Sequence, residues 1–160
     1  MRIQVGAVGR LKAGPERTLA ELYLERANVL GRSIGIGPVS IAEIAESRAA
    51  TADLRMADEA VRLGAGLPAE TLTVALDSGG RDIASEELAG LIGRWRDGGT
   101  GTLAFLIGGP DGLAPEIKSA AGFRLAFGRM TWPHRLARIM LLEQVYRSVT
   151  ILVNHPYHRM

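Results

Sequence analysis

Short apolar runs that lead directly into glycine-rich turns recur along this chain, with helical stretches between them. Thr71 to Leu76 (TLTVAL) runs into Asp77-Ser78-Gly79-Gly80, and Thr102 to Ile107 (TLAFLI) runs into the turn from Gly108 to Gly112. A continuous apolar run indicates a strand buried on both faces, and strands that alternate with helices indicate a parallel sheet. The sequence therefore predicts an α/β fold, a mainly parallel sheet with helices on both faces.

The other predicted elements follow the same alternation. Further strands are expected at Ile3–Val8, Ile34–Ile44 and Phe123–Phe127, and the glycines and proline of the second suggest a strand at the sheet edge. The expected helices run from Pro15 to Gly31, over residues 50–63, from an N-cap at Ser85 to Trp95, from Pro115 to Ala121, and from Thr131–Pro133 to Val153. The 160 residues, without a repeat or linker, indicate a single domain over 1–160.

Charge is distributed unevenly along the chain. Residues 1–123 carry 13 Lys and Arg against 16 Asp and Glu, whereas residues 124–160 carry 6 against 1, with all three histidines. Cations interleaved with Trp132, Tyr146 and Tyr157 suit a polyanion whose bases are handled one at a time. The C-terminal segment therefore predicts a nucleic-acid partner. No apolar run approaches a membrane span, so we expect a cytoplasmic protein.

The ends of the predicted strands are candidate ligand sites, because ligands of parallel sheets bind beyond the carboxyl ends of strands. Two interpretations of the IGGPDG turn (Ile107 to Gly112) remain. Its glycines let backbone approach a ligand closely, or it is an ordinary Pro-Asp-Gly turn, since it lacks the spacing of a phosphate-binding or dinucleotide loop. Asp77 likewise either accepts a ligand hydroxyl or closes its own turn.

The three histidines form no convincing metal site. His155 and His158 stand three residues apart, the chain has no cysteine, and zinc normally needs three or four ligands, so we expect no metal. His134 lies at the predicted start of the last helix, where the helix dipole favours a neutral imidazole that can accept a proton. No Ser-His-Asp or Cys-His arrangement accompanies it, which leaves covalent catalysis without support.

The last predicted helix combines an apolar stripe with cations. Leu141, Leu142, Val145 and Val149 recur at helical spacing. The stripe is expected to pack in the core or against a second subunit. Arg135, Arg138 and Arg147 are expected at the surface.

Four strings identify a family resemblance. They are LDSGG (Leu76 to Gly80), FLIGGPDGL (Phe105 to Leu113), LAFGRMTWPHRLARIMLLEQVYR (Leu125 to Arg147) and NHPYHR (Asn154 to Arg159). Together they resemble the ribosomal RNA large subunit methyltransferase H family, the smallest SPOUT methyltransferases. The match covers the whole chain, including its VGAVGRLK start.

The resemblance implies a fold with a trefoil knot on its C-terminal side, and a homodimer. It implies methyl transfer from S-adenosylmethionine to N3 of pseudouridine 1915, in helix 69 of 23S rRNA, within assembled 70S ribosomes. No membrane takes part in such a reaction.

The resemblance also implies which residues form the site. Those expected around the cofactor are Leu76, Asp77, Gly108, Gly109, Leu125, Phe127, Gly128, Arg129, Met130, Thr131 and Trp132. Gly128 occupies a position often held by a small polar residue, so only a backbone contact is expected there. The C-terminal tail is expected to reach the partner's cofactor site.

Catalytic roles are assigned from the clustering of the basic residues. Arg138 and Arg159 are expected to supply charge, Tyr157 to stack on or orient the base, and His134 or His158 to handle the proton. The rival interpretation is a non-catalytic ribosome- or RNA-binding protein with the same fold. The intact glycine turns and the PYHR ending favour the enzyme, because binding alone would not need the cofactor loops.

Overall fold

The computed structural model describes residues 1–159, with side chains as far as Tyr157. Its centre is a five-stranded, fully parallel sheet in the order β2-β1-β4-β3-β5. The strands are β1 (Arg2–Val8), β2 (Val39–Ile44), β3 (Thr71–Asp82), β4 (Thr102–Ile107) and β5 (Phe123–Ala126). The predicted α/β class and parallel sheet are confirmed. Among helices within the described range, none is long and apolar enough to cross a membrane.

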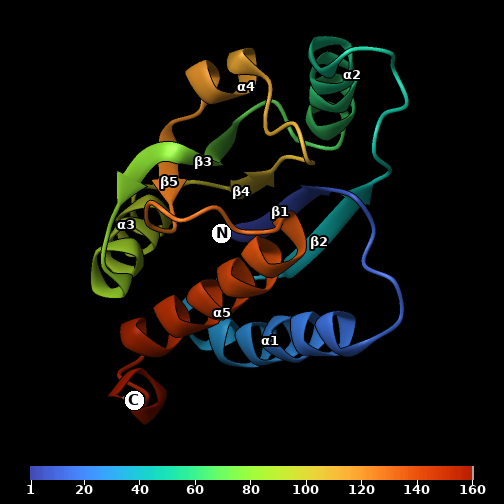
Figure 1. Cartoon of the computed structure of the whole chain (residues 1–160). Helices are drawn as coiled ribbons and strands as arrows, with labels where there is room; N and C mark the ends of the chain where they lie inside the picture. The colour runs from blue at the N-terminus through green and yellow to red at the C-terminus, as the bar shows by residue number, and fades with distance from the viewer. Residues whose placement is uncertain (160) are drawn as a thin grey trace.

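Helices cover both faces of the sheet, as predicted (Figure 1). One face carries α1 (Pro15–Gly31), α3 (Ser85–Asp97) and α5 (His134–Leu152), and the other carries α2 (Ala52–Ala65) and α4 (Pro115–Ala120). Alternate side chains of one strand reach the two layers: Val5 packs in the α1/α3/α5 core, whereas Val8 packs under α2 and α4. Short 3-10 helices, η1 (Arg32–Ile34) and η2 (Pro156–Arg159), complete the chain.

The strand predicted over Ile34–Ile44 is correct only in its second half. Residues 32–34 form η1, and the strand begins only at Val39. Gly35 and Gly37 have φ of +69° and +131°, which are incompatible with a β-ladder, and Pro38 has no N–H to donate to one. The edge position of the strand is confirmed, because β2 ends the strand order.

The DSGG segment does not end its strand, contrary to the prediction. β3 continues to Asp82, and its pairing with β5 jumps so that both Leu76 and Arg81 face Leu125. The four residues between them bulge out of the ladder. A Cβ on Gly80 would lie 2.8 Å from the carbonyl carbon of Arg124, so glycine is needed where the bulge passes β5.

The start of α3 is shifted by one residue from the prediction. Ala84, not Ser85, is the N-cap, and the Glu87 carboxylate accepts the Ala84 N–H at 2.9 Å. The hydroxyl of Ser85 instead donates to Gln144 Oε1 on α5, at 2.7 Å. The side chain expected to cap the helix therefore joins two helices.

Candidate cofactor cleft and active site

The segment between β5 and α5 crosses the carboxyl ends of the sheet. β5 lies at one edge, whereas α5 begins beside β1: a Cβ built on Gly9, directly after β1, would lie 3.3 Å from His134 Nε2. β4 and β3 lie between β1 and β5, so residues 127–133 pass over the ends of these two strands (Figure 1). The indole N–H of Trp132 donates to the Phe127 carbonyl at 3.0 Å, and this hydrogen bond joins the two ends of the segment.

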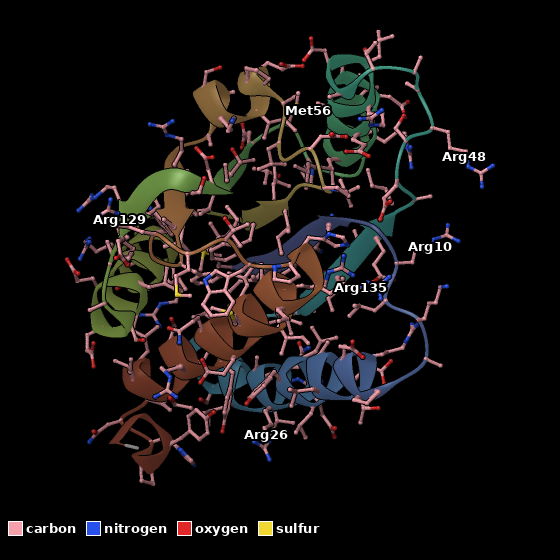
Figure 2. All side chains as sticks on the ribbon, viewed as in Figure 1. Arg10, Arg26, Arg48, Met56, Arg129 and Arg135 are labelled. Carbon is pink, nitrogen blue, oxygen red and sulfur yellow. The ribbon has the colours of Figure 1, made fainter. Side chains whose placement is uncertain are left out.

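A cleft of about 200 Å³ lies where this crossing segment meets the turns after β3 and β4. Three stretches far apart in sequence line it: Leu76 to Ser78, the turn around Gly108 and Gly109, and Leu125 to Trp132. The predicted residues that line it are Leu76, Asp77, Gly108, Gly109, Leu125, Phe127, Gly128, Met130, Thr131, Trp132 and His134. Arg129 is exposed and does not line the cleft (Figure 2).

Sequence reasoning missed five lining residues: Ser78, Ile107, Gly112, Ala126 and Ala137. All five lie within the strings that carry the family resemblance, but none was among the residues expected at the site. Ala137 follows His134 by three residues on α5, a spacing that places both on one helix face. That spacing was the available signal.

The glycine-rich turn after β4 is tightly folded. The Gly112 N–H donates to the Gly109 carbonyl at 3.0 Å, and a Cβ on Gly108 would lie only 2.3 Å from the Gly112 carbonyl carbon. The segment is therefore a compact turn whose glycines line the cleft, and the close approach of a ligand to them stays a prediction.

Helix α2 holds this turn from outside. The Arg55 guanidinium binds both oxygens of Asp111, at 2.7 and 3.1 Å, and donates to the Ala49 carbonyl at 3.2 Å. Hydrogen bonding to Arg55 holds the pKa of the Asp111 carboxyl below its usual value. The turn is thereby tied to the segment that follows β2. Nothing in the sequence linked these residues, which stand 56 positions apart.

His134 lines the cleft, and the carboxylate of Glu46 lies close to its imidazole. Its Nε2 is 3.9 Å from Glu46 Oε1, and its side chain is 23% exposed. Burial lowers the pKa of the imidazole, the nearby charges of Arg138 and Arg135 lower it further, and Glu46 opposes them. The lowered pKa favours the neutral imidazole, the state expected for a proton acceptor.

Arg138 is not at the surface, contrary to the prediction. It is fully buried, and its guanidinium donates to the Val8 and Gly9 carbonyls at 3.0 and 2.9 Å and to the Glu43 carboxylate. The face of α5 that carries it packs on the carboxyl end of β1, where two carbonyls need donors. Arg138 does not line the cleft, so its structural position is that of a core cation that holds α5 on β1.

The C-terminal tail packs on the C-terminal half of α5. The Tyr157 hydroxyl donates to Glu143 Oε1 at 3.1 Å, and its ring lies 4.7 Å from the ring of Tyr146 and 5.1 Å from the Arg147 guanidinium carbon. Burial, with hydrogen bonding and the charge of Glu143, raises the pKa of the Tyr157 phenol. The side chains of His158 and Arg159 lie outside the described residues.

Tyr157 does not line the cleft of its own chain. Glu143, which Tyr157 contacts, follows His134 by nine positions, about 13 Å along α5. Residues 154–157 do not line the cleft. Among the side chains that the structure describes, no group of three or more His, Asp or Glu residues is placed to hold a metal ion.

Comparisons with known proteins find close relatives over the whole chain. The family model described as "Predicted SPOUT methyltransferase" matches residues 1–158. Proteins named ribosomal RNA large subunit methyltransferase H from Bradyrhizobium diazoefficiens and Beijerinckia indica are 54% and 52% identical, over 99% of both chains in each case. A solved probable methyltransferase from Bordetella pertussis has a TM-score of 0.49 at 14% identity, covering 92% of this chain and 96% of its own.

Proposed function

Because the chain belongs to the SPOUT methyltransferase family, we propose that it methylates 23S rRNA with S-adenosylmethionine as donor. The proposed target is N3 of pseudouridine 1915 in helix 69 of assembled 70S ribosomes. The observation that carries the proposal is the full-length match to relatives of this name, joined to a cleft where the three motif segments meet. A ribosomal target implies that the protein acts in the cytoplasm.

The cleft fits the proposed donor chemically. Leu76, Ile107 and Leu125 offer an apolar wall for a purine ring, and glycine backbone in the turn after β4 allows close approach. The Asp77 carboxylate lies in the same cleft and suits the positive charges of a sulfonium amino acid. S-adenosylmethionine, when bound there, supplies an already activated methyl group.

The protein's own task is to orient the base and to remove a proton. His134 takes the N3 proton onto its imidazole, which leaves N3 the electron pair needed for the new bond to carbon. Its depressed pKa keeps the imidazole ready to accept, and Glu46 stabilises the imidazolium that forms. The other proposed proton acceptor, His158, would come from the tail.

The tail is proposed to act in the partner subunit of a homodimer. Tyr157 does not line the cleft of its own chain, which supports a role for His158 and Arg159 in the cleft of the partner. Arg159 would then supply the cation near the base, a role that the burial of Arg138 leaves open. The trefoil knot is likewise proposed from the family.

A non-catalytic RNA-binding protein of the same fold is the alternative. Isothermal titration with S-adenosylmethionine distinguishes the two, because a binder does not need the cleft. Saturable heat that disappears in a Gly109→Val variant supports the enzyme: a Cβ there already meets Val8 at 2.9 Å. Absence of heat at millimolar ligand contradicts it.

A further inference from the structure

A second hollow, of about 740 Å³, lies beside the cleft along the edge of the sheet. It runs between α4 and β5, the edge strand, and the β3 bulge contributes to it. Its lining residues comprise Gly79, Gly80, Arg81, Pro115, Lys118, Ser119, Ala121, Gly122, Phe123 and Arg124. We call it the edge groove. It adjoins the cleft, because Asp77 and Ser78 of the cleft directly precede Gly79.

The floor of the edge groove is largely bare backbone. Gly79, Gly80 and Gly122 contribute no side chains, and tight packing requires two of them: a Cβ would meet the Arg124 backbone at 2.8 Å from Gly80, and Leu72 Cδ1 at 2.6 Å from Gly122. β5 pairs only with β3, so its other edge is free of strand partners. A ligand backbone can therefore approach the floor closely.

The walls of the edge groove are cationic. Arg81, Lys118 and Arg124 line it, and no lining residue is acidic. The nearest compensating charge is Asp77, whose oxygens lie 3.9 Å from Lys118 Nζ and 3.7 Å from Arg124 NH1, both longer than hydrogen bonds. The single carboxylate of Asp77 does not balance three cations, so the groove keeps a net positive charge and N–H donors that can bind oxyanions.

We propose that the edge groove binds the phosphate backbone of the substrate RNA next to the nucleotide in the cleft. The inference rests on the proposed function and assigns it a substrate-docking surface. Phosphates repeat along a strand, and three cations line the groove to contact them; the Arg81 guanidinium carbon lies 5.4 Å from the centroid of the Phe123 ring. A strand that leaves the cleft past Asp77 enters this groove directly.

The test is ribosome binding, measured by sedimentation at several salt concentrations. The double variant Lys118→Gln/Arg124→Gln should bind on the order of tenfold more weakly. Its slope of log affinity against log salt should be shallower by about 1.4 to 1.8, because each lost phosphate contact removes about 0.7 to 0.9. Its affinity for S-adenosylmethionine should not fall below that of the wild type, because Asp77 in the cleft loses only two neighbouring cations.

The matched control is Arg2→Gln/Arg32→Gln, which removes the same charge at the amino ends of the strands, where β1 begins and before β2. If the groove variant loses no more affinity than this control, the groove proposal is overturned. The proposed function fails separately, if the wild-type protein binds ribosomes but transfers no methyl group.

Crosslinking identifies the class of partner. The chain has no cysteine, so Ser119→Cys in the groove and Ser33→Cys in η1 each give one site for a photoreactive label. On ribosomes, the Ser119 site should crosslink to 23S rRNA and the Ser33 site should not. Crosslinking of the Ser119 site to ribosomal protein alone would overturn the assignment to RNA.

Discussion

Arg55 on α2 binds both carboxylate oxygens of Asp111, in the turn that follows β4 and lines the cleft. The same guanidinium donates to the Ala49 carbonyl in the segment after β2, the segment that also carries Glu46. One side chain thus ties the turn proposed to hold the methyl donor to the segment that faces His134.

Because Asp111→Asn breaks the ion pair that ties the turn to α2, it should weaken binding of S-adenosylmethionine by about two- to fivefold. Arg55→Lys should weaken binding as well, because a lysine ammonium cannot bind both Asp111 oxygens as the arginine guanidinium does. Titration calorimetry measures the change. Asp58→Asn is the control, since it breaks an ion pair on the same helix outside the turn. Equal effects of the two substitutions would exclude a special role for Asp111.

The ion pair between buried Arg138 and partly exposed Glu43 predicts a loss of stability when it is broken. Arg138→Met leaves a carboxylate without its partner and two carbonyls without donors, which should lower the free energy of unfolding by roughly 3 kcal/mol. Urea denaturation measures it, and Arg135→Gln, one turn away, should change stability by less than about 0.5 kcal/mol. A variant of Arg138 that keeps its stability and loses only activity would instead support the original prediction of a direct role.

The surroundings of His134 predict a defined pH dependence. A base with a depressed pKa loses activity only when the pH falls below the usual histidine range. Glu46→Gln removes the charge that raises the imidazole pKa, so the acid limb of the pH–rate profile should move to lower pH. Arg135→Gln removes a charge that lowers the pKa, so the limb should move to higher pH. Single-turnover rates on ribosomes test both shifts, and an acid limb that neither substitution moves would exclude His134 as the base.

Mixing two defective chains tests whether the tail acts in the partner subunit. One chain carries Gly109→Val in the cleft, and the other lacks residues 156–160. Alone, each should be inactive. A mixed dimer has one intact pair of cleft and tail, so co-expression should restore part of the activity. No recovery in a purified mixed dimer would show that each tail serves its own chain.

Much of the fold could be predicted because its signals are local. The apolar runs at Thr71–Leu76 and Thr102–Ile107 are strands, and the rule that ligands bind at strand ends led to the cleft. Local patterns could not show that the DSGG segment is a bulge, since this depends on β5 passing beside Gly80.

The missed features depend on contacts between distant residues. Arg138 has the polarity of a surface residue, and only the packing of α5 against β1 gives it Glu43 and two carbonyls as partners. Arg129 belongs to a motif that lines the cleft, but its side chain is exposed. The edge groove requires the bulge, α4 and β5 together, so no single segment predicted it.

Mass spectrometric mapping of 23S rRNA tests the proposed methyl transfer most directly. Ribosomes from a strain lacking this protein would be incubated with the purified chain and S-adenosylmethionine carrying an isotopically labelled methyl group. The proposed function predicts one labelled methyl group, on N3 of the helix 69 pseudouridine, and none after incubation with the Gly109→Val variant. Unlabelled rRNA after incubation with a wild-type chain that binds the ribosome, or a label at another nucleotide, would contradict it.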